Sequence, residues 1–275
     1  MTKPYDVCWE RIARADKHRA ALTKVWNAFI EGDPYVPVAR VEVDGTGSIS
    51  IEQVRPIPAV AALELGEFLY QMRAALDACI YETACVNTGQ RPPPDERKLE
   101  FPICEDAEAF KNAGWKIAPL TQEQRDIVES VQPYNMPKDL TPDVVPFSLN
   151  RTLSILHDWA RKDRHRKLHV VASWASNINP QLIIPAGAAL VEFNVARDTF
   201  VLRAEAQVAT FRIDGCQPGM VVNANPNLVL DPAVDEAPLP CHDRDRLGHR
   251  LGFIHVTVAT IVDRIAKTVG MQRRE

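Results

Sequence analysis

The sequence predicts an α+β protein in which a helical bundle with an N-terminal β-hairpin packs on an antiparallel β-meander. Three observations support this fold class: a long amphipathic helical pattern at 59–87, alternating runs on both sides of a glycine-containing turn at 36–55, and three alternating runs at 189–214. At 275 residues the chain is long enough for one large core. We therefore expect a single α+β domain over 1–275.

The first part of the chain, 1–167, is expected to be mainly helical apart from the hairpin. A first helix over 4–31 ends at the Gly-Asp-Pro sequence 32–34, because glycine and proline stop helices. The hairpin turns at the Gly-Thr-Gly sequence 45–47. The helix at 59–87 has an apolar stripe about 120° wide, enough to bury one face. The stripe comprises Leu65, Phe68, Leu69, Met72, Leu76, Cys79 and Ile80.

A helix that gives way to a strand is predicted between Pro146 and Trp174. Proline suits a first helical turn, where its missing N–H would be unpaired anyway. From Leu168 the sequence is β-branched and aromatic, which favours a strand. The tetrapeptide DRHR at 163–166 therefore lies where the helix ends and polar side chains are needed for unpaired backbone groups. The apolar stripe of this helix comprises Leu149, Leu153, Leu156, Trp159 and Ala160.

The remaining elements complete the prediction. Two short helices are expected at 105–112 and 121–132, the second with a capping box from Thr121 and Gln124. Residues 168–240 are expected to be mainly β, with the three runs at 189–214 forming a meander with one buried face. A C-terminal helix is expected within 241–270. Its apolar positions are Ile254, Val258, Ile261, Val262, Ile265 and Val269.

The composition excludes several classes of protein. The net charge of −4 argues against a protein that coats nucleic acid or an anionic membrane. No apolar run approaches the roughly 20 residues of a membrane-spanning helix, and the charged N-terminal stretch shows no export signal. The six cysteines form no CxxC pair, so reduced thiols in a cytoplasmic protein are expected. Neither a glycine-rich phosphate loop nor another cofactor motif is present, and no cofactor is expected.

The candidate site consists of ionisable residues on the two predicted helices. Arg73 and Asp77 lie four residues apart and can pair along one helix. Asp163 falls on the apolar stripe of the other helix, so its carboxylate needs a partner, while His165 and Arg166 follow it. If the cluster is structural, these charges tie the two helices together at the edge of the core. If it is catalytic, the acids orient His165 for proton transfer and the arginines hold phosphate.

Four short motifs, taken in order, resemble a loosely defined group of uncharacterised bacterial proteins. They are LGEFLYQMRAALD at 65–77, FPI at 101–103, VQPY at 131–134 and DRHR at 163–166. The resemblance covers roughly residues 60 to 170 and implies no established activity. This chain departs from the group at Ala78, where the group often has His, and at Arg164, where it has Lys.

A second resemblance links the group to HEPN-type helical ribonucleases, whose signature is Arg followed after four to six residues by His. Ala78 removes that histidine here, but Arg151 with His157 and Arg164 with His169 fit the spacing. The resemblance implies RNA cleavage as an alternative function.

Two other stretches contain residues that can bind a metal ion. His165 and His169 lack the Glu of an HExxH site and are surrounded by positive charge. Cys241, His242, His249 and His255 could supply ligands, but their spacing matches no zinc module. A solvated helix start explains the second stretch as well, and no metal is predicted at either.

The leading hypothesis is a non-catalytic protein that binds a protein or small-molecule partner, because no catalytic set is assembled in the sequence. The rival is a ribonuclease or other phosphoester-cleaving enzyme that uses Arg73, Asp77, Asp163, His165 and Arg166. The basic run at 160–169 leaves nucleic-acid binding open, and a homo-oligomer is compatible with either hypothesis. No contact with a membrane is expected.

Overall fold

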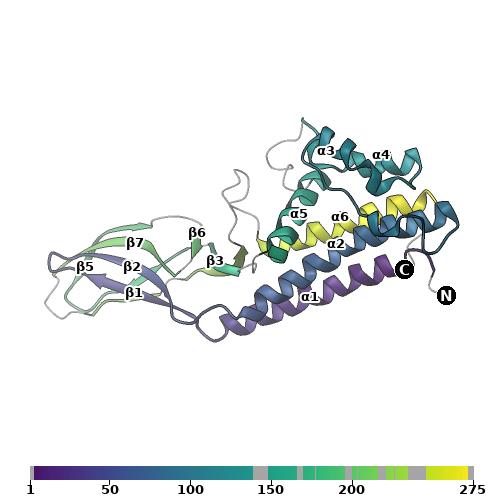
Figure 1. Cartoon of the computed structure of the whole chain (residues 1–275). Coiled ribbons are helices and arrows are strands. Elements are labelled where there is room, and N and C mark those ends of the chain that lie inside the picture. The colour runs from purple at the N-terminus through teal and green to yellow at the C-terminus, as the bar shows by residue number, and fades with distance from the viewer. Residues whose placement is uncertain are drawn as a thin grey trace. The chain divides into compact units, whose positions relative to one another are not determined.

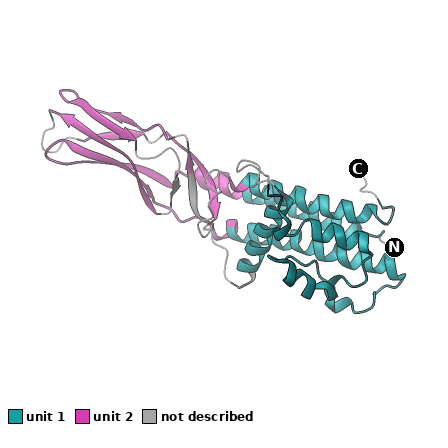
Figure 2. Cartoon of the chain, turned by 90° about the horizontal axis from the view of Figure 1, so that it is seen from above, with its two compact units in different colours: residues 1–22, 62–168, 248–275 teal, residues 23–61, 169–247 magenta. Residues whose placement is uncertain are grey.

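The computed structural model shows a mixed α and β protein, as predicted. Contacts between residues divide the chain into two compact units, coloured separately in Figure 2. The helical unit comprises Met1–Leu22, Ala62–Leu168 and Gly248–Glu275, and the sheet unit comprises Thr23–Ala61 and His169–Leu247. The structure describes residues 3–138, 148–165, 170–176, 178–195, 200–202, 204–215, 221–225, 227–234 and 246–271.

The chain crosses between the units four times. The single domain over 1–275 stays a prediction. Three of these crossings fall inside helices: within α1 (Asp6–Ile30), within the first turn of α2 (Ala59–Thr88) and after the first residue of α6 (Leu247–Lys267). Linkers between domains are usually recognised by a loop rich in proline, glycine and polar residues. Where the chain passes between units inside a helix, the sequence has helical periodicity and no linker composition. The boundary therefore cannot be recognised from the sequence.

The predicted helices are present with small shifts at their ends. The long ones are α1, α2, α5 (Leu149–His165) and α6 (Leu247–Lys267), and the short ones are α3 (Ala107–Asn112) and α4 (Gln122–Ser130) (Figure 1). The capping box at the start of α4 is confirmed, since Thr121 and Gln124 bond each other's backbone N–H groups. Short 3-10 helices occupy Glu96–Lys98, Gly114–Ile117 and Pro133–Asn135.

The core of the helical unit is built on α2. All seven residues of its predicted stripe are fully buried, as are Leu153 and Trp159 of α5 and Val258 of α6. Burying a side chain of this size stabilises the fold by roughly 1.5–3 kcal/mol, so these stripes supply most of the driving force for packing the helices.

Side-chain contacts set the register of α1 against its neighbours. Arg11 Nη1 donates to Gln71 Oε1 at 3.2 Å, and seven residues later His18 Nδ1 lies 2.8 Å from Glu64 Oε2. From the first contact to the second, the residue number rises from 11 to 18 on α1 and falls from 71 to 64 on α2. The two helices therefore run antiparallel. His255 Nε2 of α6 lies 2.9 Å from Asp16 Oδ2, so α1 also contacts α6.

The described residues of the sheet unit form antiparallel strands in three sheets. The largest has the order β1-β2-β7-β5, with β1 at Tyr35–Val41, β2 at Thr46–Gln53, β7 at Glu205–Asp214 and β5 at Ala189–Val195 (Figure 1). A second sheet has the order β6-β3-β9, with β6 at Phe200–Leu202, β3 at Val170–Ser176 and β9 at Val229–Val234. A third pairs β4 (Gln181–Ile183) with β8 (Asn223–Asn225). Their core comprises Ile49, Ile51, Leu202, Val208, Ala209, Phe211, Ile213 and Val222.

The predicted hairpin is confirmed as β1 and β2, and glycine is required at its turn. Gly45 has a φ of 83°, and a Cβ atom there would lie 2.1 Å from the carbonyl oxygen of Ile213. Gly47 is needed because a Cβ atom would lie 2.4 Å from the ring of Phe211. Because both glycines lack a side chain, β7 can lie close beside the hairpin at these two residues.

The meander predicted at 189–214 is wrong in its connectivity. The first run becomes β5 and pairs with β7, but Phe200–Leu202 leaves that sheet and pairs with β3. Alternation indicates that a run is a strand without indicating its partner. The short strands β4 and β8 were not predicted, because three residues are too few to show a period. Pro146, expected to open α5, lies outside the described residues.

None of the helices in the described part of the chain is both long enough and apolar enough to cross a membrane.

Candidate functional site

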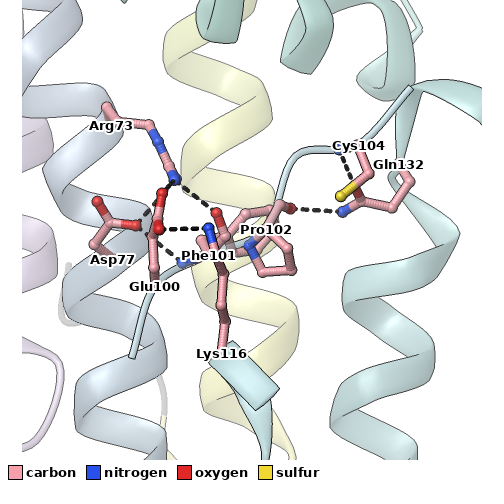
Figure 3. A network of polar contacts seen from close by, with 8 residues as sticks. All are labelled: Arg73, Asp77, Glu100, Phe101, Pro102, Cys104, Lys116 and Gln132. Atoms are coloured by element: carbon pink, nitrogen blue, oxygen red, sulfur yellow. Dashed lines mark hydrogen bonds and ion pairs between the residues drawn. The ribbon is translucent and has the colours of Figure 1, made fainter. Parts of the chain in front are cut away.

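Arg73 is the centre of a polar network on α2 (Figure 3). Its Nη2 atom donates to the carbonyl oxygen of Phe101 at 2.7 Å and to Glu100 Oε1 at 2.8 Å. Its Nη1 atom lies 3.0 Å from Asp77 Oδ1, which is an ion-pair distance without hydrogen-bond geometry. The predicted pair of Arg73 and Asp77 is therefore present. The side chain of Arg73 is only 8% exposed, so its charge is neutralised inside the fold.

The carboxylates around Arg73 have further partners in the same network. Asp77 Oδ1 accepts the backbone N–H of Phe101 at 2.9 Å, and Lys116 Nζ donates to Glu100 Oε2 at 2.6 Å. Partial burial would raise the pKa of the Glu100 carboxyl. The hydrogen bond from Lys116 and the charges of Arg73 and Lys116 outweigh this effect and lower the pKa below its usual value.

The segment after Phe101 is held from its other side by Gln132 (Figure 3). Gln132 is fully buried, and its Nε2 atom donates at 2.9 Å to the carbonyl oxygens of both Pro102 and Val128. Its Oε1 atom accepts the backbone N–H of Cys104 at 2.9 Å. Asn150 of α5 in turn donates to the carbonyl oxygen of Gln132 at 2.8 Å. The short FPI segment is thus fixed in the core by side chains that replace a strand partner.

Asp163 contacts α2 at a different place from Arg73. Its carboxylate oxygens lie 2.7 and 2.8 Å from where a Cβ atom would stand on Gly66, so the missing side chain of that glycine makes room for them. Gly66 and Arg73 are seven residues apart, which is about 10 Å along a helix. The structure therefore brings Arg73 together with Asp77, and Asp163 together with Gly66. The side chain of His165 and all of Arg166 lie outside the described residues.

Two histidine–carboxylate pairs were missed in the sequence. His18 pairs with Glu64 between α1 and α2, and His255 pairs with Asp16 between α6 and α1. Both histidine side chains are 20% exposed, so both pairs are reached by solvent. Asp16 and His18 belong to the sequence DKHR at 16–19, which differs from DRHR at 163–166 in one residue. Their partners lie far away in the chain, which is why the pairing was not predicted.

A groove of about 560 Å³ runs beside this face of α1. Its polar lining includes Arg11, Arg14 and Lys17 from α1, together with Gln71 from α2. Glu10 is the one acidic residue among the lining residues. Arg11 Nε is buried and has no hydrogen-bond partner in the described part of the protein. A groove lined by three cationic side chains and one acidic side chain is suited to an anionic ligand.

The metal sites weighed in the sequence gain no support. Cys241 and His242 lie outside the described residues, while His249 is exposed and His255 is paired with Asp16. Among the residues that the structure describes, no three His, Cys, Asp or Glu side chains are grouped as a metal site would require.

One of the two HEPN-like spacings lies within the described part of the chain. Arg151 and His157 both lie on α5, but six residues correspond to about 240° of rotation, so they do not share a face. His169 lies outside the described residues.

Three of the four motifs that resemble the bacterial group meet in one place. The motif at 65–77 supplies Arg73 and Asp77, FPI supplies the backbone that they bind, and VQPY supplies Gln132. The fourth motif, DRHR, is described as far as His165. No family model, curated protein or solved structure matches the chain.

Proposed function

We propose that this protein is a non-catalytic binding protein and that the groove along α1 receives an acidic segment of a partner protein. The observation that carries the proposal is the groove itself, where three cationic side chains face one acidic residue in a chain whose net charge is negative. Arg14 and Lys17 are exposed and line the groove, so their charged groups are available to carboxylates of the partner.

The lining favours a peptide over a nucleic acid. Proteins that bind single-stranded nucleic acid usually stack bases on aromatic side chains, and the groove has no aromatic residue among its lining residues. Val7 and Ala13 instead give it an apolar part, and Val7 is 37% exposed. A helix with one acidic and one apolar stripe would match this combination. Glu10 would repel a continuous phosphate backbone more than it would a peptide with spaced charges.

The Arg73 network supports a structural use of the motif residues. Each of its charged side chains bonds the FPI backbone or another charged member of the network, and Arg73 is too buried to reach a ligand. A group that binds substrate needs free donors or acceptors directed at a cleft. Arg14 and Lys17 of the groove are exposed, whereas the cation at the centre of the network, Arg73, is buried.

The proposal is tested with a fluorescently labelled helical peptide that carries glutamates on one face and leucines on the other. We expect binding to the intact protein at low salt that weakens as salt rises. The double charge reversal Arg14→Glu with Lys17→Glu should weaken binding about tenfold or more, since it turns two attractions into repulsions. The matched control reverses two exposed cations elsewhere in the same unit, Arg97→Glu with Lys111→Glu.

Fluorescence anisotropy gives the dissociation constants. The proposal fails if the peptide does not bind, or if both double variants weaken binding equally. It also fails if single-stranded RNA of similar charge binds more tightly than the peptide, because the partner would then be a nucleic acid.

A second candidate function is phosphoester cleavage, and the pair of His18 and Glu64 favours it. A carboxylate that accepts the Nδ1 proton leaves Nε2 free for proton transfer. Arg14 precedes His18 by one helical turn on α1 and could hold a phosphate group. In this form the enzyme would use α1 rather than the Arg73, Asp77, Asp163, His165 and Arg166 set suggested by the sequence.

The two enzymatic versions are separated by substitution. RNA cut by the intact protein and left whole by His18→Ala supports the α1 site. Cleavage lost only in His165→Ala supports the set suggested by the sequence. RNA that remains uncut, with and without divalent metal ions, removes both.

A further inference from the structure

The strand β5 forms one edge of the four-stranded sheet and is unusually exposed. Within the described part of the chain it pairs only with β7, and six of its seven residues are exposed. Three apolar side chains, Leu190, Val191 and Val195, are between 43% and 57% exposed. The opposite edge, β1, contains Pro37, a residue that blocks further pairing. On β5 the only charge is Glu192, and the register shifts between Leu190 and Glu192. Glu192 and the register shift protect the start of the strand, and the edge after Glu192 is open to pairing with another strand.

The sequence of β5 is self-complementary about its centre. Residues 191–195 read Val-Glu-Phe-Asn-Val, so the residue types on the two sides of Phe193 match in polarity. If two copies run antiparallel with their two-fold axis at Phe193, Val191 lies opposite the partner's Val195. Glu192 then lies opposite the partner's Asn194. Both pairs match in polarity, and neither places like charges opposite each other.

The charges on this face fit the same register. Asn194 Nδ2 already donates to Glu192 Oε1 of its own strand at 2.8 Å, so the amide and the carboxylate are complementary. Glu192 also lies opposite Arg212 of β7 in the ladder, which balances the carboxylates that two copies would bring together. A register centred on Glu192 would instead place two carboxylates directly opposite each other and is disfavoured.

We propose that β5 is a self-association surface, in which the strand pairs antiparallel with β5 of a second copy about Phe193. The two four-stranded sheets then continue edge to edge through an isologous interface. Edge pairing alone covers less area than a standard protein interface, so the dimer forms weakly, with a dissociation constant of roughly 10–100 µM. The apolar side chains of β5 become partly covered in the dimer.

Substitutions at Asn194 test the register, because opposite charges there give opposite results. Asn194→Lys places the lysine of each copy opposite Glu192 of the other copy and should tighten the dimer about fivefold or more. Asn194→Glu places carboxylates opposite each other and should weaken it about as much. The control pair is Val43→Lys and Val43→Glu, which change the net charge equally at a residue that is 94% exposed outside the strands.

Sedimentation of the full chain between about 1 and 500 µM, on both sides of the expected dissociation constant, gives the association constants. The order Asn194→Lys, native chain, Asn194→Glu, with both Val43 variants close to the native chain, supports the proposal. A native chain that stays monomeric over this range overturns it. So does a dimer in which both Asn194 variants shift association in the same direction, or in which the Val43 variants reproduce their effect. Circular dichroism of each variant verifies that the fold is unchanged.

Discussion

Replacing Arg73 by methionine should destabilise the helical unit by about 2–3 kcal/mol, and the structure shows where the loss arises. Methionine keeps the packing of the buried stem but removes both hydrogen bonds from Nη2. The two carboxylates contribute little to this loss of stability, because both are partly exposed to water, Glu100 to 44% and Asp77 to 36%. Glu100 also keeps its hydrogen bond from Lys116, and Asp77 keeps the one from the Phe101 N–H. The loss therefore centres on the carbonyl oxygen of Phe101, a residue that is fully buried.

The size of the destabilisation follows from the buried carbonyl oxygen of Phe101, which loses its hydrogen-bond donor in the variant. A hydrogen bond to a charged group contributes about 1.5–3 kcal/mol, and a buried acceptor left without a partner costs about 1–3 kcal/mol. These two ranges describe the same loss from two sides and are not added. The matched control is Arg97→Met, which removes an exposed guanidinium and should change the free energy of unfolding by less than about 0.5 kcal/mol.

Urea unfolding followed by far-UV circular dichroism measures the helical transition for both variants. Amide hydrogen exchange adds a local measurement, because the N–H groups of Phe101 and Cys104 should exchange faster in Arg73→Met than in the native chain. If Arg73→Met is as stable as Arg97→Met, and both amides remain protected, the network does not hold the FPI segment and the reasoning is refuted.

Three further predictions concern the same unit. Gln132→Ala should cost about 2–3 kcal/mol, because it unpairs several buried backbone groups, whereas the exposed Gln122→Ala should cost under about 0.5 kcal/mol; urea titrations that give equal losses would contradict this. Gly66→Ala should destabilise the native chain, because the alanine Cβ atom collides with the Asp163 carboxylate. In an Asp163→Ala variant the same change should stabilise the fold by up to about 1 kcal/mol, because alanine favours a helix more than glycine does. A double-mutant cycle that gives the same sign for Gly66→Ala in both backgrounds would contradict this. The pKa of Glu100 is lowered in the folded state, so the stability that its ionised carboxylate contributes is complete above the usual carboxyl pKa and is lost as the pH falls through the folded-state pKa. As the pH is lowered from about 5, the free energy of unfolding should therefore fall less steeply for Glu100→Gln than for the native chain.

The predictable parts of the fold are those set by neighbours in the chain. The stripe on α2, the capping box at Thr121 and the pair of Arg73 and Asp77 all depend on residues three or four positions apart. Helical periodicity makes such contacts visible in a sequence. The turn at Gly45 is equally local.

The unpredicted parts depend on residues far apart in the chain or on backbone atoms. Arg73 binds the carbonyl of Phe101, and a backbone acceptor has no signature in residue types. His18 finds Glu64 46 positions away, so the DKHR sequence indicated polarity without indicating a partner. The pairing of β6 with β3 was missed for the same reason, because alternation defines a strand and leaves its neighbour open.

The two contacts that join α1 to α2, Arg11 with Gln71 and His18 with Glu64, limit the insertions that α1 can accept. Inserting one residue between Arg11 and His18 would turn the rest of the helix by about 100° and separate one of these side chains from its partner on α2. Evolution and protein engineers can therefore lengthen this molecule at its connecting segments far more easily than within its first helix.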